Sequence, residues 1–263
     1  MCAGESAGRL ASVLARLHRP VGHAAGSGAA VRRAKVLGQN FLFDRQVLAR
    51  FAAAAGDLRG TELVVEIGAG PGGLTTSLLA AGARRVVAVE RDAPCIDALR
   101  SSGLEEAAGA ALRLIHGDAR KISLSQICDE EAIHSPGSVR VVGNLPFSVG
   151  TRLLVNWVTP PDVRIESFTL LFQTEVAERI CAAHNTSQYS RLSVLIQAWA
   201  SARMLYTIPA SAFVPPPKVG TTLVSIAPLQ PHQELASQDR RLMPEESSAL
   251  LAVTAAAFRQ VRV

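Results

Sequence analysis

The segment ELVVEIGAGPGG, residues 62–73, decides the fold. Its first six residues form a short, mostly apolar run that is typical of a buried strand. Gly68, Gly70 and Gly73 follow in a G-x-G-x-x-G pattern, and a helical stretch begins at Gly73. Glycine suits this position because the turn is tight and a ligand can lie against bare backbone. The pattern occurs in NAD-dependent enzymes, in methyltransferases and in some structural turns, so by itself it predicts only a strand, a loop and a helix.

Strand and helix signals alternate along the rest of the chain. We expect further strands over RVVAVE (85–90) and near residues 112, 139 and 168. Helices are expected over residues 93–100, 151–157, 175–183 and 189–200. ARMLYTI (202–208) and TTLVSIAP (221–228), on either side of a proline-rich loop, are expected to be two closing strands. This order predicts an α/β fold with a parallel sheet and helices on both faces.

The composition of the chain supports a large packed core. Hydrophobic residues make up 48% of the 263 residues and charged residues 19%, which argues against wholesale disorder. Two alanine-rich apolar runs, residues 48–55 and 250–258, are too short to span a bilayer and are expected to be core helices. The four cysteines lie far apart without a C-x-x-C pair. We therefore expect a reducing compartment, and neither a disulfide nor a metal site.

The net positive charge of the chain comes from its N-terminal segment. The net charge is +5, and residues 1–35 alone carry six basic side chains and one acidic side chain. The remaining residues are neutral overall, so a phosphate-binding surface there must come from local clustering. The arginine-rich start, with Leu10, Val13, Leu14 and Leu17 at helical spacing, is typical of an organelle transit peptide. The alternative is a helix that packs on the domain, followed by a linker over residues 22–28.

Three carboxylates lie next to the expected loops. Glu66 immediately precedes the glycine loop, and Glu90 ends the following strand, where it could accept both hydroxyls of a ribose. Asp118, at the end of the next expected strand, could accept a hydrogen from an adenine amine. The alternatives are a solvated acid at a strand end for Glu90 and a helix cap for Asp118.

The segment Asn144-Leu145-Pro146-Phe147, which ends the fourth expected strand, indicates a specific reaction. The Asn144 amide oxygen and the Leu145 carbonyl could each accept one hydrogen from an amine that is conjugated to a base ring. These bonds would favour a pyramidal nitrogen whose lone pair points at a methyl donor. Pro146 stiffens the loop, and Phe147 offers a face for an extruded base, worth about 1–3 kcal/mol. The alternative is an ordinary turn after a buried strand.

Seven motifs extend this pattern over about residues 35–228. In order they are KVLGQNFL (35–42), EIGAGPGGLT (66–75), HGD (116–118), GNLPFSV (143–149), FQTEVAER (172–179), SRLSV (190–194) and FVPPPKV (213–219). Together they resemble the ribosomal RNA adenine dimethyltransferase family. The wording of GNLPFSV, AER and SRLSV is similar to the mitochondrial branch of that family.

The resemblance implies a Rossmann-like class I methyltransferase fold with a seven-stranded, mostly parallel sheet, and S-adenosylmethionine as the cofactor. It implies that the cofactor is bound by Gln39, Asn40, Leu42, Gly68, Gly70, Glu90, Asp118 and Asn144. Residues 144–147 would form the catalytic segment. Phe147 and Phe213 would form the two walls of the base slot, although Phe213 taken alone is typical of core packing.

The function implied by the resemblance is the addition of two methyl groups to each of two adjacent adenosines near the 3′ end of small-subunit rRNA. The expected partners are this rRNA and the immature small ribosomal subunit, with no membrane and no metal, and the protein is expected to be a monomer. We expect it in the mitochondrial matrix, with a cytoplasmic or nucleolar location as the alternative. Two other functions stay open: a catalytically idle assembly or transcription factor that keeps the fold, and an NAD-dependent oxidoreductase, which would leave residues 144–147 unexplained.

The sequence predicts three parts of the chain. Residues 1–34 are expected to be the transit peptide, or an N-terminal helix with its linker, and residues 35–230 the methyltransferase domain. Residues 231–263 are expected to begin a C-terminal helical domain that is truncated in this chain. Relatives usually carry a basic helical domain there, of which residues 244–260 resemble only the first helix. We therefore expect weak RNA affinity, or docking that is helped by ribosomal proteins.

Overall fold

A computed structural model describes Leu10, Ser12 and residues 39–135, 137–159, 164–229, 249–250 and 252–254. Leu10 is helical and lies against the apolar core of the domain. The other residues of the expected N-terminal helix, and most of the expected helix over 250–258, lie outside the described residues. The division of the chain into 1–34, 35–230 and 231–263 therefore stays a prediction.

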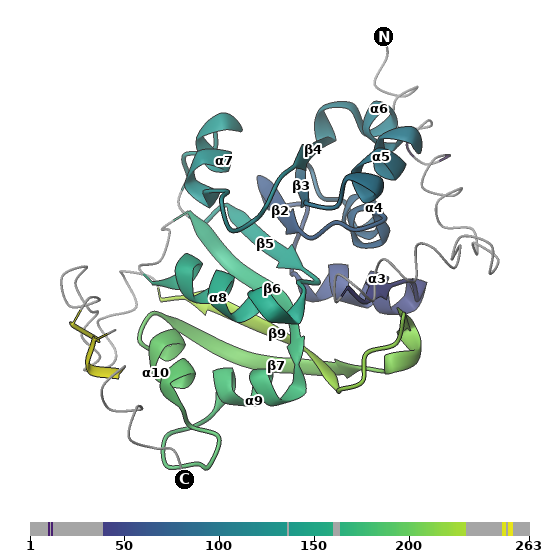
Figure 1. Cartoon of the computed structure of the whole chain (residues 1–263). Coiled ribbons are helices and arrows are strands. Elements are labelled where there is room, and N and C mark those ends of the chain that lie inside the picture. The colour runs from purple at the N-terminus through teal and green to yellow at the C-terminus, as the bar shows by residue number, and fades with distance from the viewer. Residues whose placement is uncertain are drawn as a thin grey trace.

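The structure confirms the α/β fold with a seven-stranded, mostly parallel sheet (Figure 1). The strand order is β4 (Leu112–His116), β3 (Val86–Glu90), β2 (Leu63–Ile67), β5 (Val139–Gly143), β6 (Ile165–Gln173), β9 (Thr221–Pro228) and β7 (Ala200–Ile208). The first five of these strands run parallel, and β9 is antiparallel to both of its neighbours. The chain builds outward from β2 to β4 and then crosses to β5 on the other side of β2. The carboxyl ends of β2 and β5 thus form a topological switch point, where ligands bind in open α/β sheets.

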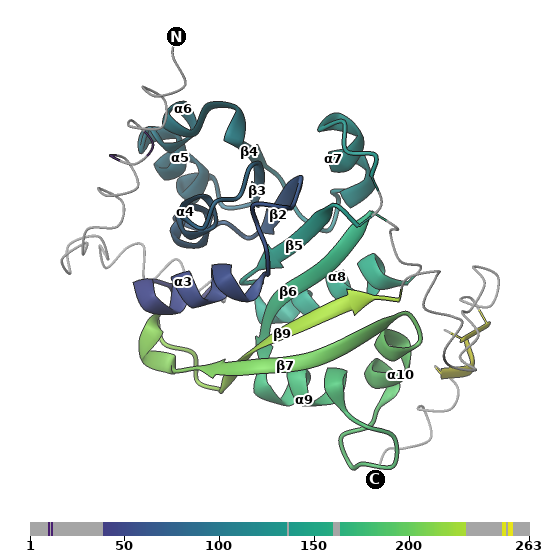
Figure 2. The ribbon, with the colours of Figure 1, turned by 180° about the vertical axis from the view of Figure 1, so that it is seen from behind.

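Helices cover both faces of the sheet, as Figure 1 and Figure 2 show from opposite sides. One apolar core joins the sheet to α3 (Arg45–Ala54), α4 (Gly73–Ala80), α5 (Ala93–Ser101) and α6 (Leu104–Ala108). A second core joins the other face to α7 (Leu124–Glu130), α8 (Phe147–Val158), α9 (Thr174–Cys181) and α10 (Arg191–Gln197). The central strands are apolar on both sides because both sides are buried. The run Leu63–Ile67 shows this, since every residue in it is buried.

Several boundaries differ from the sequence prediction. α8 begins at Phe147 rather than at residue 151, because the Pro146 carbonyl accepts hydrogen bonds from the Val149 and Gly150 N–H groups and starts the helix there. The expected helix over 189–200 is only Arg191–Gln197, and β7 already begins at Ala200. The expected helix over 175–183 ends at Cys181.

Besides two three-residue 3-10 helices, η2 (Gly109–Ala111) and η3 (Ala210–Ala212), four elements of the described residues were absent from the sequence prediction. Two of them are the helices α6 and α7, and the others are the two-residue strands β1 (Phe41–Leu42) and β8 (Phe213–Val214). The two strands pair with each other in antiparallel fashion, with Leu42 opposite Phe213. Two residues carry no periodicity, so such a pair cannot be recognised from the sequence.

We expect Phe51→Ala to lower the free energy of unfolding by about 3–5 kcal/mol, because the ring of Phe51 is fully buried between α3 and the sheet and its loss leaves a cavity. Denaturant unfolding followed by circular dichroism measures this change. Phe43→Ala is the matched control, since that ring is 45% exposed and should cost much less. Equal losses for both variants would contradict the placement of Phe51.

Candidate active site

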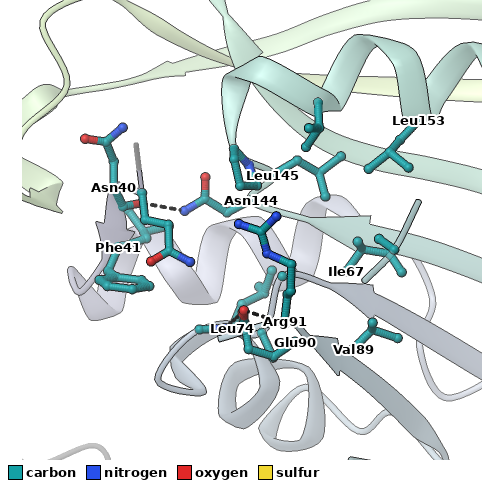
Figure 3. Close-up of a pocket in the computed structure, with 18 of the residues that line it drawn as sticks. Asn40, Phe41, Ile67, Leu74, Val89, Glu90, Arg91, Asn144, Leu145 and Leu153 are labelled. Atoms are coloured by element: carbon teal, nitrogen blue, oxygen red, sulfur yellow. Dashed lines mark hydrogen bonds between the residues drawn. The ribbon is translucent and has the colours of Figure 1, made fainter. Parts of the chain in front are cut away.

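A pocket opens at the carboxyl ends of β2, β3, β4 and β5 (Figure 3). Its walls come from residues 39–42, the glycine loop 67–71, residues 89–91, residues 117–120 and residues 144–149. Eleven of the twelve site residues predicted from the sequence line it: Gln39, Asn40, Leu42, Gly68, Gly70, Glu90, Asp118, Asn144, Leu145, Pro146 and Phe147. The switch point of the sheet therefore brings together loops that are far apart in the chain.

The glycine loop presents bare backbone to this pocket. Gly68 and Gly70 have φ values of 79° and 54°, a region that side chains disfavour. A Cβ atom on Gly70 would also lie 3.0 Å from the ring of Phe41, which covers the loop from the opposite wall. Glycine is thus favoured at position 70 by its conformation, and a larger residue there would also press on the Phe41 ring.

Glu90 is a rigidly held carboxylate with 5% exposure. Its Oε2 accepts from the Gly70 N–H, and its Oε1 accepts from the N–H groups of Arg91 and Asp92, each at 2.7 Å. A carboxylate has about four lone-pair positions, so about one remains for a ligand hydroxyl. This differs from the expectation that Glu90 accepts both hydroxyls of a ribose, because the backbone N–H groups occupy the other positions.

Glu66 is a second carboxyl close to Glu90, and its side chain is fully buried. Its Oε2 accepts from the Thr75 hydroxyl at 2.6 Å, whereas its Oε1 has no hydrogen-bond partner among the described residues. Burial, with a further contribution from the charge of Glu90, raises the pKa of Glu66 to about 7, although the Thr75 hydrogen bonds oppose the shift. The position of Glu66 before the glycine loop was recognised from the sequence without a ligand being assigned to it, and an acid inside the apolar run LVVEI is a further signal that it is buried.

Asp118 forms an ion pair with Arg120 at the edge of the pocket. Nη2 of Arg120 lies 2.5 Å from Oδ2, and its Nε lies 3.0 Å from Oδ1. The guanidinium holds the pKa of the Asp118 carboxyl well below its usual range. An adenine amine would therefore have to compete with Arg120, which also lines the pocket and which no sequence argument had singled out.

The Asn144 side chain is oriented by a backbone group from a distant part of the chain. Its Nδ2 donates to the Asn40 carbonyl oxygen at 2.8 Å, as the dashed line in Figure 3 shows. A carbonyl oxygen accepts but cannot donate, so the NH₂ group must face Asn40. The amide oxygen Oδ1 is consequently turned away from Asn40 and can serve as an acceptor for another group.

The two aromatic residues predicted to form a base slot are not equivalent. Phe147 is half-buried, lines the pocket and begins α8. Phe213 is only 2% exposed, belongs to the apolar core and does not line the pocket. This placement disagrees with the expectation that Phe213 forms the second wall of the base slot. Phe213 pairs with Leu42 in the β1–β8 pair, and its ring is buried in the apolar core there.

No group of three or more histidine, cysteine, aspartate or glutamate side chains is placed to hold a metal ion among the described residues. Within those residues, none of the helices has the length and apolar character needed to cross a bilayer.

Comparison with known proteins places this geometry in context. Residues 31–242 match the model of the family described as ribosomal RNA adenine dimethylase. Ribosomal RNA small subunit methyltransferase A of Ruegeria pomeroyi is 44% identical over 230 residues, which cover 87% of this chain and 76% of that protein. The protein of the same name from Paracoccus denitrificans is 43% identical over 234 residues, which cover 88% of this chain and 76% of that protein.

Two solved structures have the same fold. A dimethyladenosine transferase from Plasmodium falciparum superimposes with a TM-score of 0.63 at 25% identity, covering 82% of this chain and 70% of that one. The 23S rRNA methyltransferase ErmE superimposes with a TM-score of 0.61 at 24% identity, covering 85% of this chain and 80% of that one. The second of these likenesses supports the fold alone.

The predicted mitochondrial matrix location is wrong, and so is the assignment to the mitochondrial branch. The curated relatives that match this chain at 42–45% identity are bacterial proteins. The short motif similarities behind that assignment are outweighed by similarity over most of the chain.

The buried Glu66 carboxyl leads to a pH-dependent prediction. Because its folded-state pKa of about 7 lies above the ordinary value of 4.5, the folded protein binds more protons than the unfolded chain between these values. The free energy of unfolding should therefore fall as pH rises from about 5 to 7, by on the order of 3 kcal/mol from this group.

Glu66→Gln should remove this contribution to the slope. Compared with the wild type, the variant should therefore have a more favourable free energy of unfolding at pH 8 than at pH 5. Urea unfolding of both proteins across this range measures the difference. Glu62→Gln, immediately before the same strand, is the control and should keep the wild-type slope. A slope that is identical in the wild type and in Glu66→Gln would contradict the raised pKa.

Proposed function

The chain belongs to the ribosomal RNA adenine dimethylase family, and from this premise we propose that it transfers methyl groups from S-adenosylmethionine to the exocyclic amine of adenines in small-subunit ribosomal RNA. The observation that carries the proposal is the hydrogen bond from Asn144 Nδ2 to the Asn40 carbonyl. That bond leaves the Asn144 amide oxygen available to a base amine. The names of the relatives, ribosomal RNA small subunit methyltransferase A, support the same substrate class.

The residues of the pocket fit an adenosine-containing cofactor. Glu90 keeps about one lone-pair position for a ribose hydroxyl, and Gly68 and Gly70 allow a ligand to approach the backbone. Two acidic side chains, Glu66 and Glu90, lie together at this end of the sheet, which favours a ligand of positive charge. When bound, S-adenosylmethionine supplies an electrophilic methyl group on a sulfonium.

The segment that follows β5 would position the base. The lone pair of an adenine amine is delocalised into the ring, so the amine is a poor nucleophile while it stays planar. Acceptance of its two hydrogens by Asn144 Oδ1 and by the Leu145 carbonyl favours a pyramidal nitrogen with its lone pair directed at the methyl group. Orientation of this kind lowers the barrier without a strong base. On transfer of the methyl group the nitrogen would lose a proton to solvent, and the cofactor would leave as the uncharged thioether.

Phe147 would hold the base against this segment. Its ring is half-buried at the start of α8 and lines the pocket beside Pro146. A base extruded from its stack loses stacking energy, and an aromatic face restores about 1–3 kcal/mol of it. Because Phe213 is buried in the core, Phe147 carries this role without a second wall from Phe213.

The RNA must also meet the protein outside the base slot. Arg91, Arg120 and Lys121 are exposed at the carboxyl ends of β3 and β4, and the two arginines line the pocket. Asp118 compensates the charge of Arg120, so Arg91 and Lys121 supply the local positive charge on a domain whose overall charge outside its first 35 residues is neutral. We infer small-subunit rRNA, carried by the immature subunit, as the partner, and a monomeric protein.

We expect Asn144→Ala to lower the methylation rate by about 100-fold, because the variant loses a preorganised polar group beside the reacting nitrogen. Affinity for S-adenosylhomocysteine should change by less than about tenfold, since most cofactor contacts remain. Methyl transfer to immature small subunits, read by mass spectrometry of the rRNA, measures the first quantity, and calorimetry measures the second. Asn156→Ala, on the exposed face of α8, is the matched control. An undiminished rate in Asn144→Ala would contradict the catalytic assignment.

Phe147→Ala should reduce turnover more than cofactor affinity, because its ring would contact the base rather than the cofactor. The loss of stacking corresponds to a decrease of about 5- to 150-fold in the methylation rate constant. Phe147→Tyr keeps the aromatic face and should restore most of the rate. If Phe147→Ala weakened only the binding of S-adenosylhomocysteine, the stacking role would be refuted.

A further inference from the structure

Two buried acids share one side of the sheet beside the pocket. Glu66 on β2 is opposite Ala88 on β3, and Glu90 lies two positions further along β3. Side chains alternate between the faces of a strand, so Glu66, Ala88 and Glu90 leave the sheet on the same side. That side is covered by α3 and α4. The carboxyls are 0% and 5% exposed, so water screens neither of them well.

The hydrogen bonds of the two carboxyls are unequal. Glu90 accepts three backbone N–H groups, an arrangement that stabilises a negative charge. Glu66 accepts from the Thr75 hydroxyl through Oε2, while Oε1 is buried without a partner among the described residues. A buried oxygen without a donor indicates that the Glu66 carboxyl is poorly suited to carry the second charge of the pair.

The charged groups on the described elements around Glu66 do not compensate a negative charge on its carboxyl. Glu90 is the charged group that acts on Glu66, and α4, with the sequence GLTTSLLA, contains no titratable side chain. On α3, Arg45 and Arg50 are exposed, and Arg50 lies over the Tyr206 ring at 4.4 Å. On β5, the Arg140 guanidinium donates to the Thr61 hydroxyl, the Ala55 carbonyl and the Glu166 carboxylate.

We propose that Glu66 is a positioning residue that holds a proton in the ligand-free protein and releases it when the cationic cofactor enters the pocket. The inference rests on the proposed function, because S-adenosylmethionine would bring a cationic sulfonium into the pocket that Glu90 lines. The O–H bond of the Glu66 carboxyl breaks, the proton passes to the buffer, and the carboxylate that forms is compensated by the ligand charge.

The ionised Glu66 acts through Thr75. Thr75 lies in the first turn of α4, immediately after the glycine loop. A carboxylate accepts a stronger hydrogen bond from a hydroxyl than a neutral carboxyl does. Release of the proton therefore tightens the Glu66–Thr75 contact and holds the start of α4, with the loop before it, in the ligand-binding conformation. Cofactor affinity thus becomes linked to pH through a residue that does not line the pocket.

Isothermal titration calorimetry on the full chain tests this directly. S-adenosylmethionine is titrated at pH 7 in two buffers of different ionisation enthalpy, which reports the protons released per ligand bound. We expect about 0.3–0.5 proton for the wild type and none for Glu66→Gln. Glu62→Gln, at the residue that precedes the same strand, is the matched control and should release as much as the wild type. A merely structural role of Glu66 would change affinity without changing the proton count.

Two further arms keep the test decisive. S-adenosylhomocysteine lacks the sulfonium charge and should release fewer protons than S-adenosylmethionine. Thr75→Val removes the hydroxyl donor to Glu66, so the pH of maximal proton release should move upward. This variant decides the matter even if Glu66→Gln does not fold. Equal release with both ligands, or an unshifted maximum in Thr75→Val, would overturn the inference.

The outcomes separate this inference from the proposed function. If neither ligand binds the folded wild-type chain, the proposed function fails, and this inference fails with it. If S-adenosylmethionine binds with the same proton count in the wild type and in Glu66→Gln, or with none between pH 6 and 8, only the role of Glu66 is lost.

Discussion

The parallel pairing of β2 with β5 is the constraint on which the site depends. These strands come from distant parts of the chain, and their carboxyl ends are packed so closely that a Cβ atom on Gly143 would lie 2.5 Å from the Ile67 carbonyl oxygen. The next residues continue this contact, since a Cβ atom on Gly68 would lie 3.3 Å from the Asn144 carbonyl oxygen. The glycine loop and the segment 144–147 are therefore neighbours in space. A methyl donor and a base amine can meet only because this pairing places their two loops side by side.

A second layer of control comes from segment 39–43, which closes the pocket from the other side. Asn40 orients the Asn144 amide, and Phe41 covers Gly70. The segment is itself held by the β1–β8 pair and by the hydrogen bond from the Phe43 N–H to the Ala212 carbonyl. The amide that would contact the base is thus positioned by a strand from near the opposite end of the domain. Preorganisation of this kind explains how a single amide can contribute to catalysis without a strong base beside it.

The electrostatic interaction of the two acids beside the pocket depends on their burial. Glu66 and Glu90 are close together in a region that excludes water. The backbone N–H groups of Gly70, Arg91 and Asp92 donate to Glu90 rather than to Glu66. The folded protein therefore tolerates one negative charge more readily than two. A cationic ligand reverses that balance. The same pair of acids that costs stability at neutral pH can in this way contribute to selectivity for a charged cofactor.

The alternation of strands and helices, the glycine loop and eleven of the residues that line the pocket can be read from the sequence alone. Apolar periodicity and glycine spacing are local properties, so they can be recognised from the sequence alone. The partner of each polar group is visible in the folded structure alone: Asp118 pairs with Arg120, Asn144 with Asn40, and Glu66 with Thr75. The folded structure also shows that Phe213 is buried in the core and that α8 begins at Phe147. Such facts depend on contacts between residues far apart in the chain or on how a loop is packed, and no local pattern records them.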